Sequence, residues 1–167
     1  TLMGRSELES LVIVMAVRKQ LPTSTDDNFH GKRFWIAATR RAAVARSLAG
    51  LLHPQTQSEA FVSGLLQDMA VPLLVSVGPS SYAPLYEHWH GDAAAQLEQL
   101  ERGEYGWCHA VVGSAMAHKW ELPVALTKNI DAHHEDDDGA DPAVRLAAKI
   151  REHSVTPGVE QLVETCR

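Results

Sequence analysis

Apolar residues recur at helical spacing along nearly the whole of this 167-residue chain, and no strong two-residue alternation predicts a strand. The clearest apolar stripe joins Phe34, Ala38, Ala42, Ala45 and Ala49, which fall on one broad face of a helix. A chain of this length can bury a sizeable core within one domain. We therefore predict a single all-α domain over residues 1–167.

Prolines and capping residues set the expected ends of two of the helices. His53 precedes Pro54, and a residue before proline is pushed out of the helical region, so the long second helix is expected to end there. Asp141 is a good N-cap with Pro142 at the first helical position, and the helix that they open is expected to run to about residue 153. Other expected helices cover about 6–21, 82–90, 92–102, 107–120 and 123–134, one opens near Thr56 and carries Asp68, and a short one follows residue 158. Residues 22–31 are expected to form a loop.

Charge and composition narrow the classes of function. The 15 basic and 21 acidic residues give a formal charge of -6, whereas a non-specific nucleic-acid binder needs a basic surface. The longest apolar runs are interrupted well before the ~20 residues that span a membrane. Cys108 and Cys166 form no CxxC pair and indicate a reducing compartment, so we expect a cytoplasmic protein. The chain starts at Thr1 rather than Met, which suggests a piece of a longer protein.

Three of the expected helices carry an aspartate or a histidine on an apolar face. Asp68 and His109 each lie on the buried stripe of a helix, and His133 and His134 flank the stripe of a third. Buried polar groups are costly unless they are hydrogen-bonded or bind a metal. These four residues therefore predict either a divalent-metal site or an internal hydrogen-bond network without an ion, and spacing alone favours the network.

Basic residues cluster on the helix that carries the alanine stripe. Arg33 and Arg40 share one face of it and are candidates for binding a phosphate or an acidic partner, although a solvated face is the simpler explanation. In the acidic stretch EDDDGAD at 135–141, neither a glycine nor a terminal glutamate falls where the EF-hand pattern requires it, so we expect a solvated loop there. No nucleotide-binding loop or serine-nucleophile motif occurs in the chain.

Four segments follow one another along the chain: FWIAATRRAAVARSLA, FVSGLLQDMAV, LEQLERGEYGWCHAVVGSAMAHKWELP and IDAHHE. This ordered set resembles the HDOD family, a bacterial signalling branch of the HD superfamily. The resemblance covers about residues 2–153, leaves 154–167 as a C-terminal extension and implies an HD-domain-like multi-helix bundle. Counterparts of several helices that open the full family domain are not found. The positions that match the family motif are Glu101, Gly106, His109, Gly113, Trp120, Leu122, Pro123, His133 and His134.

The same resemblance implies that the metal site of catalytic HD proteins is dismantled in this chain. Catalytic members hold metal with a histidine, an adjacent His-Asp pair and a distant aspartate. By that correspondence the first histidine falls at Ala37, the pair at Gln67 and Asp68, and the distant aspartate at Ala148. Only Asp68 keeps a side chain that can bind metal, so we expect no catalytic residue, no bound metal and no cofactor.

The resemblance implies a non-catalytic regulatory or interaction module in bacterial signal transduction. It also suggests a link to cyclic di-nucleotide signalling. The expected partner is another protein, another domain of the same protein or a second copy of the chain. The alternative is a metal-dependent phosphohydrolase that uses Asp68, His109, His133 and His134. A third hypothesis places a nucleotide or another anion near Arg33, Arg40 and the histidines.

Overall fold

The computed structural model describes residues 5–21, 29, 31–135 and 139–151, and these residues contain helices and no strand. The predicted all-α class is therefore confirmed. The helices are α1 (Arg5–Gln20), α2 (Gly31–Leu52), α3 (Gln57–Leu66), α4 (Ala70–Val77), α5 (Tyr82–Gly91), α6 (Leu97–Tyr105), α7 (His109–Lys119), α8 (Val124–Asp131) and α9 (Pro142–Ala148), with a 3-10 turn at Pro54–Thr56. The predicted loop at 22–31, part of the acidic loop and the predicted final helix lie wholly or largely outside the described residues.

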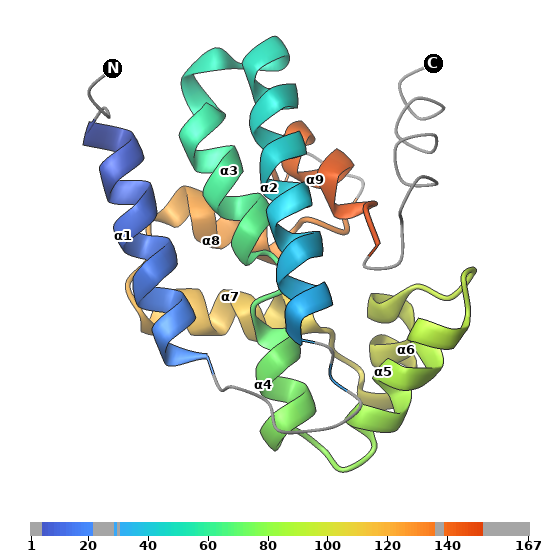
Figure 1. Ribbon diagram of the computed structural model, residues 1–167. Helices are drawn as coiled ribbons and strands as arrows, with labels where there is room; N and C mark the ends of the chain where they lie inside the picture. The colour runs from blue at the N-terminus through green and yellow to red at the C-terminus, as the bar shows by residue number, and fades with distance from the viewer. Residues whose placement is uncertain (1–4, 22–28, 30, 136–138, 152–167) are drawn as a thin grey trace.

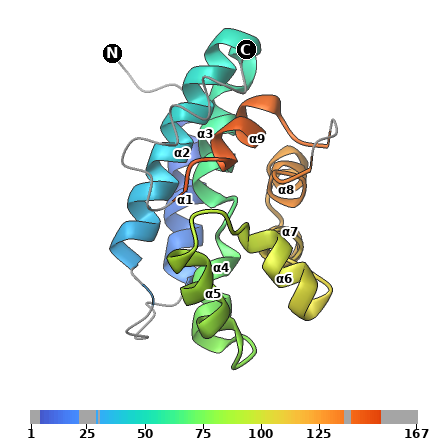
Figure 2. The same cartoon turned by 90° about the vertical axis from the view of Figure 1, so that its right-hand side faces the viewer.

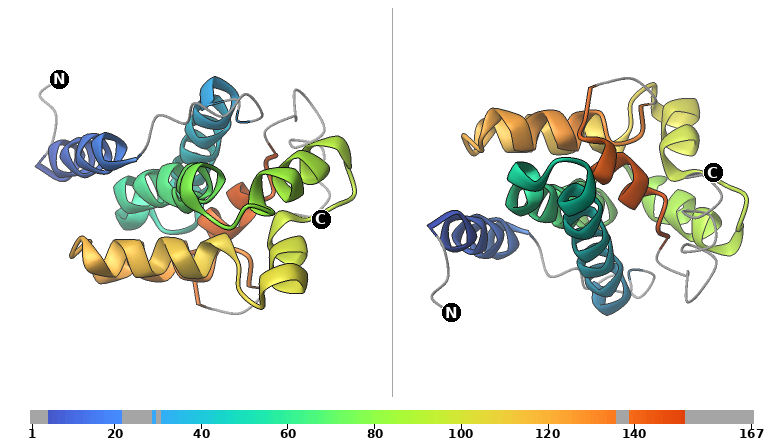
Figure 3. Two further views of the ribbon diagram at one scale, coloured as in Figure 1. Left: turned by 90° about the horizontal axis from the view of Figure 1, so that it is seen from below. Right: turned by 90° about the horizontal axis from the view of Figure 1, so that it is seen from above.

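The helices pack in layers around α3. Helix α2 lies beside α3, α9 packs against both, and α1 packs along another side of α3 (Figure 1). Helices α7 and α8 lie on the side of α3 that faces away from α2, as Figures 2 and 3 show from three further directions. Helices α4, α5 and α6 extend the bundle at one end, where α4 also contacts α7. The loops where these layers meet hold the polar residues described below.

Two kinds of packing build the core. At the end formed by α2, α4 and α5, large aromatic side chains are buried together, among them Phe34, Tyr82 and Tyr86. Along α2, α3 and α9, the contact is made almost entirely by alanine and valine. A Cβ atom on Gly64 of α3 would lie 3.0 Å from the carbonyl oxygen of Arg41, so α2 and α3 approach as closely as their backbones allow. This close approach fixes where Arg41 lies relative to α3.

The structure confirms two predicted helix ends and changes others, among them the end of α8, which lies at Asp131 rather than at His134. Helix α2 ends just before His53, and the Asp141 carboxylate accepts a hydrogen bond from the Ala143 N–H at the start of α9. Helix α6 starts at Leu97 rather than near 92, because the Asp92 carboxylate accepts from the Ala94 N–H and holds a turn there. Helix α9 ends at Ala148 rather than near 153.

One stretch, Pro54–Val77, is apolar and long enough to pass a simple test for a membrane span. Two-thirds of its most apolar window (67%) is buried inside the fold, and the stretch is interrupted by a turn at 67–69. Core helices of soluble proteins pass the same test, so the finding is weak support for a membrane segment.

Candidate functional site

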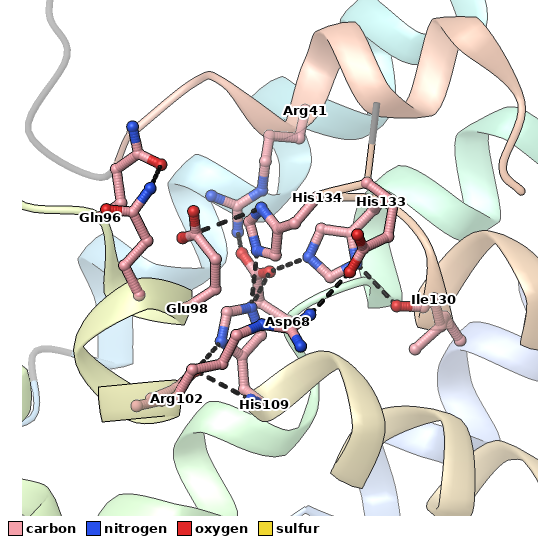
Figure 4. Close-up of polar contacts among 12 residues, drawn as sticks. Arg41, Asp68, Gln96, Glu98, Arg102, His109, Ile130, His133 and His134 are labelled. Atoms are coloured by element: carbon pink, nitrogen blue, oxygen red, sulfur yellow. Dashed lines mark hydrogen bonds and ion pairs between the residues drawn. The ribbon is translucent and has the colours of Figure 1, made fainter. Parts of the chain in front are cut away.

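Three chain segments bring one aspartate and three histidines together near the middle of the bundle. Asp68 lies in the turn between α3 and α4, His109 opens α7, and His133 and His134 follow the end of α8 (Figure 4). One donor atom from each of these four side chains lies within 4.8 Å of the others. Asp68 was expected within a helix, but the turn lets its carboxylate reach both histidine-bearing segments.

The two oxygens of the Asp68 carboxylate face different partners. Oδ1 lies 3.3 Å from His109 Nε2 and 3.2 Å from His133 Nε2. Oδ2 lies 2.7 Å from Nη2 of Arg41. The Asp68 side chain is 17% exposed, while those of Arg41 and His109 are almost completely buried. Asp68 is thus the link between a group of histidines and one buried arginine.

Hydrogen bonds behind the histidines fix the direction of their rings. His109 Nδ1 lies 2.7 Å from Glu101 Oε2, and the same oxygen accepts the His109 backbone N–H at 2.9 Å. The Tyr82 hydroxyl donates to the other oxygen of Glu101. His133 Nδ1 donates to the Ile130 carbonyl at 2.7 Å. Both rings therefore turn Nε2 toward Asp68, an arrangement also found where histidines bind metals.

The charges of the site depend strongly on one another. Burial by itself lowers the pKa of His109, but Asp68 and Glu101 outweigh it and raise that pKa to about 10, so His109 is a cation. Burial raises the pKa of Asp68, yet Arg41 and the hydrogen bonds from His109 and His133 hold it well below its usual value. Burial, followed by the nearby His133 and His109, lowers the pKa of His134, which is therefore neutral. The His134 Nε2 atom lies 3.0 Å from His109 Nε2.

Arg41 is the functional residue that the sequence interpretation did not single out. It is 3% exposed, and its Nη1 atom donates to the Ile150 carbonyl at 3.1 Å, which ties α2 to the end of α9. Helical geometry places Arg41 about 20° from Phe34 on the buried stripe of α2, and this angle is the signal that could have identified it. It lies one turn after Ala37 on the same helix.

A cavity of about 980 Å³ opens beside these residues. Its wall includes Asp68, the three histidines, Arg41 and Ala148. Basic side chains of α9 and the segment after it, Arg145, Lys149 and Arg151, also line it. Arg151 donates to the backbone carbonyls of Trp89, Asp92 and Ala93 and so closes one end of the wall against the α5–α6 connection.

Arg33 and Arg40, expected near the histidines, do not line this cavity. Both are exposed, and Arg40 borders a separate hollow of about 770 Å³ beside Trp35. The reason is geometric, since adjacent residues on a helix point about 100° apart and only Arg41 points inward. The hypothesis of an anion between Arg33, Arg40 and the histidines is corrected accordingly.

The remaining motif residues have structural places. Gly106 ends α6 with a left-handed φ of 74°, a conformation that favours glycine. A Cβ atom on Gly113 would lie 3.0 Å from Ile130 Cγ2, so glycine permits the approach of α7 to α8. Trp120 and Leu122 pack against a buried apolar cluster that includes Leu66 of α3 and Ile130 of α8. Pro123 is the N-cap of α8. Gln67 is 1% exposed, and neither polar atom of its amide has a hydrogen-bond partner among the described residues.

The residues present fit one divalent ion between Asp68 and the histidines. Three imidazoles and a carboxylate suit zinc, manganese, iron or nickel, and the buried His133 Nε2 faces Asp68 Oδ1 at 3.2 Å. His109, His133 and Asp68 would be the principal ligands, with His134 as the fourth. Alanines at 37 and 148 offer no ligand for a second ion, and Arg41 already holds the remaining Asp68 oxygen.

Comparisons with known proteins agree with this architecture. The family model of the HDOD domain matches residues 1–136. The chain is also similar to a crystal structure from Shewanella amazonensis SB2B described as a "Putative phosphohydrolase", with a TM-score of 0.73 and 24% sequence identity. That match covers 96% of this chain and 62% of the other, so the chain spans less than two-thirds of that protein. No curated protein matches the chain significantly.

Proposed function

The chain belongs to the HDOD family, within the HD superfamily, and from this premise we propose that it is a non-catalytic regulatory module of bacterial signal transduction. The single observation that carries the proposal is the ion pair between Arg41 and Asp68. A catalytic metal site keeps an open coordination position for water or substrate. Here a guanidinium holds one oxygen of the only carboxylate in the donor set.

An assay for hydrolysis tests this proposal. We expect the purified chain to release no phosphate or nucleotide product from phosphodiesters, nucleotides or cyclic di-nucleotides in the presence of Mn²⁺, Fe²⁺ or Ni²⁺. The matched control is Asp68→Ala, which removes the central carboxylate. Metal-dependent turnover that disappears in Asp68→Ala would show that the chain is an enzyme and would reject the proposal.

The second candidate is a metal-dependent phosphohydrolase that uses Asp68, His109, His133 and His134. It is supported by the grouping of the four donor atoms and by the hydrogen bonds that His109 and His133 donate to Glu101 and Ile130, which orient the rings. The structural neighbour from Shewanella amazonensis is itself described as a "Putative phosphohydrolase". Metal analysis distinguishes the two candidates, because about one equivalent of metal retained through chelator washing favours the enzyme and its absence favours the regulatory module.

An exposed apolar stripe supports a role in protein interaction. On the outer face of α1, Leu8, Leu11, Val12 and Met15 are 57%, 42%, 59% and 70% exposed. The inner face of the same helix is also apolar, with Val17 buried, and a helix that is apolar on both faces is typically covered on both. The proposed partner is a protein or another copy of this chain in the cytoplasm. Sedimentation analysis should show association that Met15→Asp weakens, and a monomer with no partner at any concentration would count against it.

The cavity supports a narrower form of the signalling proposal. A cyclic di-nucleotide carries two phosphates, and Arg145 and Lys149 line the cavity beside the histidines. Calorimetry with such a ligand should therefore give binding that Arg145→Ala weakens and Arg40→Ala leaves unchanged. Heat that is equally unaffected by both substitutions would remove the cavity from consideration as the ligand site.

A further inference from the structure

Arg41 presents a physical puzzle that the proposed function does not resolve. Its neighbours on the inner face of α2 are small and apolar, among them Ala38, Ala42 and Ala45, and each is completely buried. Burying a guanidinium in such surroundings is costly unless it is paired, and a hydrophobic residue at this place would avoid the cost. A role beyond packing is therefore needed to account for the charge.

The contacts of Arg41 indicate what the charge does. Nη2 lies 2.7 Å from Asp68 Oδ2 in an ion pair, and Nη1 donates to the Ile150 carbonyl, while neither Nη2 nor Nε has a hydrogen-bond partner among the described residues. One close ion pair and one hydrogen bond to the backbone therefore hold the guanidinium at the carboxylate. It contacts Oδ2 of Asp68, whereas the Nε2 atoms of His109 and His133 face Oδ1.

We propose that Arg41 is a built-in cation that takes the place of a divalent ion at Asp68 and weakens the binding of such ions by the neighbouring histidines. One oxygen of Asp68 is occupied by the guanidinium, and a metal at the other oxygen would lie close to a fixed positive charge. Repulsion between charges a few ångströms apart is strong in a buried setting, so the same donor atoms bind metal less well with Arg41 present than without it. The inference goes beyond the regulatory proposal, since it concerns what the site binds rather than what the chain signals.

Replacement of the arginine by a neutral side chain tests the inference. Arg41→Met keeps a long flexible chain without charge, and we expect Mn²⁺ or Zn²⁺ to bind it about tenfold more tightly, or better, than the original chain. Calorimetry measures the affinity. Thermal unfolding gives an independent readout: Arg41→Met should melt at a lower temperature without metal, and the ion should raise that temperature more than it does in the original chain.

Three further variants separate charge from structure. Arg41→Lys keeps the positive charge and should bind metal as weakly as the original chain. Arg40→Met removes an exposed charge from the neighbouring position and should also leave metal affinity unchanged. Asp68→Asn in the Arg41→Met background removes the central ligand and should abolish the gain.

The outcomes that overturn the inference are distinct from those that bear on catalysis. An affinity for Mn²⁺ and Zn²⁺ within threefold of the original chain in Arg41→Met would overturn it, as would a gain that survives Asp68→Asn. Failure of Arg41→Met to fold both with and without metal would also overturn it, because an ion then cannot replace the guanidinium. None of these results depends on hydrolysis by the original chain, which tests the proposed function alone.

Discussion

Around the cavity, His109, His133 and His134 face Asp68, whereas α2 contributes the buried Arg41 and α9 contributes Ala148. We call these the histidine side and the alanine side. The histidine side has its rings oriented by hydrogen bonds from behind, as a metal site requires. The alanine side has close helix packing and one buried positive charge, that of Arg41. The contrast teaches that a carboxylate which faces metal-type donors on one side only still needs a partner for its charge, and that Arg41 of the same chain supplies this partner.

The largest change in stability is expected when the Asp68 carboxylate, which contacts both sides, is removed. Asp68→Ala leaves Arg41 and the positively charged His109 buried without their common partner. We expect unfolding to become easier by about 3–5 kcal/mol, measured by urea titration. Glu104→Ala, on the exposed face of α6, is the control and should change stability by less than about 0.5 kcal/mol. Equal effects of the two substitutions would mean that Asp68 does not join the two sides.

A pH titration tests the histidine side alone. The pKa of His109 is about 10 in the folded chain against 6.5 for an ordinary histidine, because Asp68 and Glu101 favour the charged ring. The folded state therefore holds this proton more tightly than the unfolded state. Its contribution is complete below about pH 6.5 and is lost as the pH rises toward about 10, up to a few kcal/mol. Urea unfolding at several pH values should show this decline, and His109→Gln should flatten it.

A smaller change in stability is expected at Gln67, which by the resemblance occupies the place of the histidine in the His-Asp pair of catalytic HD proteins. Gln67 is buried and its amide has no hydrogen-bond partner among the described residues, so the folded state bears the cost of removing that amide from water. Gln67→Met keeps the length of the side chain and removes the amide. We expect stabilisation by about 1 kcal/mol in thermal or urea unfolding. Destabilisation of similar size would indicate that the amide is satisfied by bound water.

The smallest effect is expected on the outer face of α2. Arg33 is exposed and does not line the cavity, so Arg33→Ala should change stability by less than about 0.5 kcal/mol and leave any metal or nucleotide binding unchanged. Calorimetry and urea unfolding of this variant provide the baseline for the other three. A marked loss of ligand binding would place a ligand outside the cavity and reverse the present interpretation of α2.

Much of the fold was predictable because helix ends depend on local chemistry. Proline at 54 and the pair Asp141 and Pro142 act on their own backbone, and the structure has helix boundaries at both places. The end of α9 and the start of α6 were misplaced, because a turn around Asp92 and contacts between distant segments decide them. Such contacts leave no mark in the local pattern of apolar residues.

The candidate site was only partly predictable for a similar reason. Apolar stripes correctly indicated that Asp68, His109 and His133 point inward, although only His109 lies in a helix, while Asp68 lies in the turn before α4 and His133 follows α8. The same rule applied to α2 would have selected Arg41, but a run of basic residues drew attention to the face shared by Arg33 and Arg40. That Arg41 reaches across to Asp68 depends on the distance between α2 and α3, which no single helix specifies.

That distance is set by Gly64, where an added Cβ atom would meet the backbone of Arg41 and Ala42. A side chain at residue 64 would therefore push α2 away from α3 and move Arg41 away from Asp68. Substitution at position 64 is thus coupled to position 41, which lies on another helix, and to position 68, which lies in the turn after α3. Natural variants with alanine at 64 should carry compensating replacements at 41 or 68, a dependence that comparison of related genes would expose.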